Sequence, residues 1–203
     1  MAFDPDAVLR HFGQAARGYH RASTRFPWSW LRGREARALL RVVGPVEGRR
    51  VLDLGAGAGY YTRLVLGRGA RDAVAVDLSR AMVAEVGPER TLRLVADAAG
   101  VSLRRRFDLI LTAGVLEFAR DPVAVLANAA VLAAPGAALA ALVPVDSAGG
   151  RLYRSYHRRH GIAVRLYSRE SLGGAAAAAG WRLEATQRVW PYTLVARLAL
   201  AKA

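Results

Sequence analysis

Residues 51–60 read VLDLGAGAGY, and this stretch decides the fold of the chain. An apolar strand ends there in an acidic residue, and three alternating glycines lead into an expected helix. Glycine lets the backbone turn sharply and lie close to a ligand, and the amides at a helix N-terminus attract negative groups. The stretch therefore predicts a loop that holds a nucleotide-like ligand. A tight strand-to-helix turn without a ligand is the alternative.

The spacing of the glycines narrows the choice of ligand. A dinucleotide fingerprint of the G-x-G-x-x-G type requires a small third residue at position 60, where this chain has Tyr60. A phosphate-cradling loop of the G-x-x-x-x-G-K-[ST] type requires a lysine, and the only lysine of the chain is Lys202. The loop therefore disfavours NAD or FAD and does not match a phosphate-cradling loop.

Short apolar runs alternate with helical stretches from residue 51 onward, which is typical of a parallel sheet with helices on both faces. Strands are predicted at residues 50–54, 73–77, 92–96, 107–112, 137–143, 181–187 and 194–201. Helices are predicted at residues 60–68, 80–86, 98–103, 121–134 and 168–180. Asp121 and Pro122 suit the start of a helix, and Pro135-Gly136 suits its end. The predicted fold class is α/β.

Two segments depart from this alternation. Residues 19–30 form an aromatic, irregular segment between predicted helices at 5–18 and 32–43, and residues 149–169 are rich in tyrosine, histidine and arginine. Loops and flanking segments carry specificity when a rigid sheet carries the cofactor. The expected organisation is an N-terminal helical cover at residues 1–45 and a core at residues 46–203, with a substrate-covering insertion at about residues 149–169.

The motifs of the core resemble those of a known family. Residues 53–59 (DLGAGAG) are similar to the first motif of class I S-adenosylmethionine-dependent methyltransferases. Further pieces follow in the order that the family has: VAVDLS at 74–79, LVADA at 94–98, FDLILTAGVLEF at 107–118, and Pro135-Gly136. The resemblance implies a Rossmann-like, seven-stranded, mostly parallel sheet with helices on both faces and an antiparallel last hairpin.

The same resemblance implies S-adenosylmethionine as the cofactor. Asp77 would bind the ribose hydroxyls, for which a carboxylate is a suitable acceptor, and Asp97 would meet the adenine amino group. Small residues after the fourth strand would lie beneath the methionine portion. The implied cofactor-binding residues are Asp53, Gly55, Ala56, Gly57, Gly59, Asp77, Leu78, Met82, Asp97, Ala98, Ala113 and Gly114.

Methyl transfer needs positioning and exclusion of water more than a covalent nucleophile. Relatives that act on small molecules often carry a histidine after the Leu-Glu of the fourth motif, where this chain has Phe118. Residues 12–20 (FGQAARGYH) are similar to the entry segment of quinone-, biotin- and lipid-pathway methyltransferases, in which a tyrosine closes over the cofactor. Tyr19 and His20 are therefore the predicted catalytic residues, although His20 replaces the family's aspartate.

Two clusters are candidates for binding the methyl acceptor. Trp28 and Trp30 could line an apolar pocket or insert at a membrane surface, and packing of the N-terminal helices is the alternative. The predicted clamp for an acidic group consists of Tyr153, Arg154, His157 and Arg158, which could also be a solvated face. We therefore expect a small acceptor that is partly apolar and anionic.

Composition limits the other functions. The chain has 203 residues, no cysteine and a formal net charge of +14, which fits one α/β domain and excludes disulfides, thiolate metal sites and a cysteine nucleophile. No metal site is predicted. The N-terminus lacks the pattern of a secretory signal, so the expected location is cytoplasmic, with peripheral membrane binding left open.

Three alternatives to a small-molecule methyltransferase follow from charge and motif content. A lipid or quinone methyltransferase would bind an anionic membrane surface through the N-terminal segment. A nucleic-acid methyltransferase or binder is favoured only by the positive charge, because residues 112–115 (TAGV) replace the Asn-Pro-Pro-Tyr type of motif used for base methylation. A binding module with a decayed site conflicts with the intact glycines and the three acids.

Overall fold

The computed structural model describes residues 3–4, 6–13, 26–87 and 89–201. Its strands are β1 (Arg50–Leu54), β2 (Asp72–Asp77), β3 (Thr91–Val95), β4 (Phe107–Ala113), β5 (Ala133–Pro144), β6 (Trp181–Val189) and β7 (Thr193–Leu200). Its helices are α2 (Trp28–Val43), α3 (Tyr60–Leu66), α4 (Arg80–Glu85), α5 (Pro122–Leu132), α6 (Ala148–Arg159) and α7 (Arg169–Ala178), and residues 6–13 are also helical.

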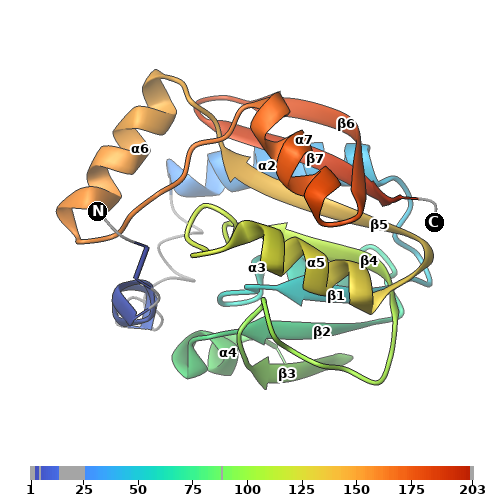
Figure 1. Cartoon of the computed structure of the whole chain (residues 1–203). Coiled ribbons are helices and arrows are strands. Elements are labelled where there is room, and N and C mark those ends of the chain that lie inside the picture. The colour runs from blue at the N-terminus through green and yellow to red at the C-terminus, as the bar shows by residue number, and fades with distance from the viewer. Residues whose placement is uncertain (1–2, 5, 14–25, 88, 202–203) are drawn as a thin grey trace.

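All seven strands form one sheet in the order β3-β2-β1-β4-β5-β7-β6. The first five strands in this order run parallel, whereas β7 pairs antiparallel with both β5 and β6 (Figure 1). The predicted seven-stranded, mostly parallel sheet with a reversed last hairpin is confirmed. The strand order reverses between β1 and β4, and ligands of open α/β sheets bind at the carboxyl ends of the strands at such a switch point.

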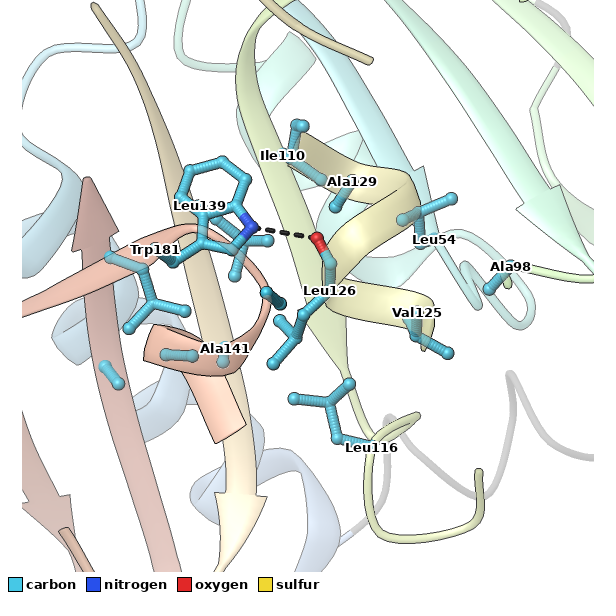
Figure 2. Close-up of a cluster of buried hydrophobic side chains, with 14 of the residues drawn as sticks. Leu54, Ala98, Ile110, Leu116, Val125, Leu126, Ala129, Leu139, Ala141 and Trp181 are labelled. Carbon is cyan, nitrogen blue, oxygen red and sulfur yellow. Dashed lines mark hydrogen bonds between the residues drawn. The ribbon is translucent and has the colours of Figure 1, made fainter. Parts of the chain in front are cut away.

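Helices cover both faces of the sheet, as predicted. Alternate residues of β1 face opposite sides, so Val51 packs with α2 and α3 whereas Leu52 and Leu54 join the cluster that contains α5 and α7. Figure 2 shows the cluster that contains Leu54 and α5. In it the Trp181 indole Nε1 donates a 2.8 Å hydrogen bond to the carbonyl oxygen of Leu126. This bond satisfies the polar atom of the largest buried side chain and joins β6 to α5.

The region from residue 98 to the end of α5 differs from the prediction in two ways. No helix forms at residues 98–103, where one was predicted: residues 98–100 form a turn, and the Asn128 side chain donates to the carbonyl oxygens of Ala98 and Val101. Asp121 caps α5 as expected by accepting from two backbone amides. However, α5 ends at Leu132 and β5 begins at Ala133. The alanine-rich sequence of this region suits both elements, so periodicity did not locate the boundary.

In the described residues, the two segments that depart from the alternation contain more helix than predicted. Residues 148–159 form the helix α6, which begins where the Ser147 hydroxyl accepts a hydrogen bond from Gly150 N. The helix α2 begins at Trp28, inside the stretch predicted to be irregular. Residues 14–25, which contain parts of both N-terminal predictions, lie outside the described residues. No described helix has the length and apolar character needed to cross a membrane.

Candidate active site

The glycine loop between β1 and α3 has a backbone that only glycine adopts readily. Gly55, Gly57 and Gly59 have φ angles of 72°, 53° and 78°. A Cβ at Gly55 would lie 2.0 Å from Cγ2 of Val115, so the loop also needs glycine there for space. Gly55 N and Ala56 N both donate to the carbonyl oxygen of Val76, which attaches the loop to the end of β2.

Asp77 ends β2 and fixes the loop from its other side. Its Oδ2 accepts a 2.8 Å hydrogen bond from Gly57 N, and its Oδ1 accepts one of the same length from Ser79 N. Burial raises the pKa of Asp77, while these two backbone hydrogen bonds act in the opposite direction. The carboxylate therefore lies beside the glycine loop with lone pairs still available to a ligand.

A cavity of about 720 Å³ opens at the carboxyl ends of the strands, at the switch point. Most of the predicted cofactor residues line it: Gly55, Ala56, Gly57, Asp77, Leu78, Met82, Asp97, Ala98, Ala113 and Gly114. Met82 lies on α4, and the others come from the ends of β2 and β4 and from the segments that follow β1, β2, β3 and β4. The motifs that were separate in the sequence therefore meet in one site.

Two predicted cofactor residues lie behind the cavity instead. Asp53 is buried, and its Oδ2 accepts a 2.6 Å hydrogen bond from Thr62 Oγ1 on α3. Burial raises the pKa of Asp53 to about 6. Gly59 is the N-cap of α3 and does not line the cavity. Both residues therefore contact α3, Asp53 through Thr62 and Gly59 as the N-cap.

Some of the predicted acceptor-binding residues line the cavity and others do not, depending on the face of the helix on which they lie. Trp28, Tyr153 and His157 line the cavity, and so does Tyr156. Arg154 and Arg158 are exposed and do not line it, because they lie on the opposite side of α6. The expected arginine clamp is thus not formed at the cavity.

The remaining predicted residues contribute elsewhere or are not described. Trp30 makes an edge-on contact with Trp190, with 5.8 Å between the ring centroids, and lies outside the cavity lining. Tyr19 and His20 lie outside the described residues. Within the described ranges, no group of three histidine, aspartate or glutamate side chains is placed to hold a metal ion.

The helix α6 and helical residues 6–13 meet over one end of the cavity. The ring centroids of His11 and His157 are 5.7 Å apart, and those of Phe12 and Phe118 are 5.4 Å apart. Tyr153 contacts His157 edge-on at 4.5 Å. Burial, followed by the nearby His11 and His160, lowers the pKa of His157 to about 4. The imidazole is therefore neutral at physiological pH.

Two buried carboxylates in the cavity wall were not predicted as site residues. Glu35 on α2 accepts hydrogen bonds from Tyr61 Oη and Thr193 Oγ1 at 2.9 and 2.6 Å. Glu117 follows β4, is 3% exposed, and burial raises its pKa to about 8. A signal for Glu35 existed, because it lies four residues from Leu31 on the apolar face of its helix. For Glu117 the signal was a carboxylate within the apolar run 107–118.

Comparison with known proteins finds related sequences. A tRNA U34 carboxymethyltransferase of Pseudoalteromonas translucida is 30% identical over 122 residues, which are 57% of this chain and 36% of that protein. The chain thus spans about a third of the length of this curated relative.

Solved structures show the same fold. A 1,6-didemethyltoxoflavin-N1-methyltransferase of Burkholderia thailandensis, with its substrate and S-adenosylhomocysteine bound, has a TM-score of 0.74 at 21% identity over 97% of this chain and 88% of that chain. A magnesium protoporphyrin IX methyltransferase of Synechocystis, with S-adenosylhomocysteine bound, has a TM-score of 0.76 at 16% identity over 98% and 100% of the two chains.

The sequence profile of the methyltransferase domain family matches residues 28–186, from the start of α2 to within β6. This range contains the glycine loop, Asp77 and the strands β1 to β5. With its fold and its motif order, the chain belongs to the methyltransferase domain family, within the class I S-adenosylmethionine-dependent methyltransferases.

Proposed function

We propose that this chain transfers a methyl group from S-adenosylmethionine to a small, partly apolar acceptor. The observation that carries the proposal is the cavity at the switch point, where the glycine loop, Asp77 and Asp97 line one continuous wall. Cavities of this size hold small organic ligands. The solved relatives with S-adenosylhomocysteine bound support the same cofactor here.

The chain's own residues fit such a cofactor. The positive φ of Gly55 and Gly57, and the open space where a Cβ of Gly57 would lie, allow close approach of the amino-acid portion, and the Asp77 carboxylate suits a ribose diol. In this proposal Asp97, which lines the cavity and whose Oδ1 accepts from Ala99 N, would accept from the adenine amino group. When bound, S-adenosylmethionine supplies an activated methyl group on its sulfonium.

The cover predicted from the sequence is part of this proposal. Helical residues 6–13 and α6 bring Phe12, Tyr153 and His157 to the acceptor end of the cavity. Aromatic walls exclude water and hold an apolar acceptor against the methyl group. Arg154 and Arg158 lie outside, whereas Arg32, Arg63 and Arg120 line the cavity, so the anionic character expected of the acceptor stays a prediction.

Replacement of Asp77 by alanine is expected to weaken S-adenosylhomocysteine binding by about 10- to 100-fold, the ~1.5–3 kcal/mol of hydrogen bonds to a charged group. Isothermal titration measures it, and thermal melts show whether the loop survives without its anchor. Glu85→Gln, an exposed carboxylate on α4, should bind like the wild type. If the wild-type protein does not bind S-adenosylhomocysteine, or binds NADH tightly, the proposed function is wrong.

A nucleic-acid acceptor is the second candidate, favoured by the name of the bacterial relative and by the net charge of +14. Mass spectrometry after incubation with S-adenosylmethionine separates the two candidates. We expect the added methyl group on members of a small-molecule panel. Transfer to bulk tRNA alone would replace the small-molecule proposal.

A membrane-surface acceptor is a further alternative, because aromatic rings and arginine gather where α2 meets the turn between β6 and β7. Trp190 is 68% exposed and contacts Trp30, over which the Arg34 guanidinium lies at 4.8 Å from the ring centroid. Co-sedimentation with anionic vesicles is expected at low salt and should weaken as salt rises. Trp190→Ala should reduce it, whereas Leu152→Ala on α6 should not. If no binding to vesicles occurs at low salt, the membrane-surface acceptor is wrong.

A further inference from the structure

Glu117 has a free hydrogen-bonding atom in the cavity wall. Its residue is 3% exposed, and its Oε2 has no hydrogen-bond partner among the described residues. The backbone around it is held firmly, because Arg165 N donates to the Glu117 carbonyl oxygen and Tyr167 Oη donates to that of Leu116. A buried carboxylate oxygen without a partner is costly. It is therefore expected to have a ligand atom as its partner.

The charges around Glu117 do not balance. Glu35 and Arg32, both on α2, are the charged groups that act on it, and all three line the same cavity. With Glu117 ionised, the two carboxylates and one guanidinium of these described groups would lack one positive charge, and the proton that Glu117 holds supplies it in the empty cavity. Glu35 already accepts from Tyr61 and Thr193. A cation that binds at Glu117 can take the place of this proton.

Aromatic side chains form other walls of this end of the cavity. Tyr60, Tyr153, Tyr192 and Trp28 line it, and the rings of Tyr153 and Tyr192 stack at 4.8 Å. The faces of aromatic rings are electron-rich and attract cations, and the Arg32 guanidinium lies over the Tyr60 ring at 5.4 Å from its centroid. Arg154 and Arg158 lie outside the cavity, whereas Arg63 and Arg120 line it.

We propose that the methyl acceptor carries a protonated nitrogen and that Glu117 pairs with it, an inference that rests on the proposed function. Glu117 releases its proton to water as the ammonium binds, and the ammonium N–H donates to its Oε2 and then transfers one proton to it. The carboxylate becomes a carboxylic acid, and the nitrogen keeps the lone pair that methyl transfer requires. The proton then passes to water. The raised pKa of the Glu117 carboxyl agrees with a group that holds a proton in this surrounding.

The test uses the full chain saturated with S-adenosylhomocysteine and three probes of one shape: benzylamine, benzyl alcohol and benzoate. Binding is followed by isothermal titration. Wild-type protein should bind benzylamine at least tenfold more tightly than benzyl alcohol, and benzoate most weakly. Glu117→Gln should abolish the preference for the amine while its affinity for S-adenosylhomocysteine stays within about twofold of wild type. Glu85→Gln, which removes the same charge from the surface, should keep the preference.

Each outcome decides one statement. If wild-type protein binds the alcohol or benzoate as tightly as the amine, or if the preference survives in Glu117→Gln, the assignment of Glu117 is wrong. The wild-type comparison alone tests the amine preference should Glu117→Gln fail to fold. Failure of S-adenosylhomocysteine to bind wild-type protein would instead count against the proposed function, and it is seen before any probe is added.

Discussion

Replacement of Gly150 by alanine is expected to lower the free energy of unfolding by about 3 kcal/mol. An added Cβ would lie 1.9 Å from the carbonyl oxygen of Val145, a backbone atom that cannot rotate away. The helix α6 would have to shift at its first turn, where Gly150 N donates to Ser147 Oγ. The better helix propensity of alanine, worth about 1 kcal/mol, does not offset this. Urea unfolding followed by circular dichroism measures the change.

Gly174 provides the matched control. It lies inside α7, and a Cβ there would meet nothing within 4 Å. Gly174→Ala should therefore raise the free energy of unfolding by about 0.5–1 kcal/mol. Equal stability of the two variants would show that α6 moves freely relative to Val145, contrary to the close packing at this position.

Glu117 is expected to make the stability of the protein fall as pH rises. Burial raises its pKa from 4.5 to about 8, so the folded state holds a proton that the unfolded state releases. The loss begins near the unfolded pKa and is complete above the folded one. At about 1.4 kcal/mol per pKa unit, it amounts to about 3–5 kcal/mol between acid and mildly alkaline pH.

Glu117→Gln isolates this contribution because it removes the titrating group at nearly constant shape. In acid, the variant and the wild type should unfold at similar urea concentrations. Toward pH 8, the variant should become progressively more stable than the wild type. Asp53, whose pKa is also raised, is present in both proteins and cancels in the difference. Glu85→Gln should follow the wild type at every pH. A difference between Glu117→Gln and wild type that does not change with pH would refute the assignment of a buried, proton-holding carboxyl.

Much of the cofactor end of the site was predictable from local sequence. The strand-to-helix turn at Gly55–Gly59 and the acid that ends β2 depend on backbone freedom and on residues that adjoin in the chain. Parallel strands bring their carboxyl ends to one edge, so the motif order already placed Asp77, Asp97 and Gly114 together. The cap of α5 by Asp121 is equally local.

The acceptor end depended on the tertiary structure. Whether Arg154 or Tyr153 reaches the cavity depends on the helical phase of α6, which the strand-and-helix alternation did not predict. Asp53 lies behind the loop because side chains alternate along β1, and its partner Thr62 comes from the following helix.

The placement of Glu35 and Glu117 in one cavity wall shows the same limit most clearly. One lies on α2 and the other after β4, and only the packed sheet brings them to one cavity. By itself the sequence determined the fold, the glycine loop and the acids at the strand ends, because these follow from neighbouring residues and strand direction. The tertiary structure decided which charges are buried and which face water, because burial depends on contacts between elements far apart in the chain.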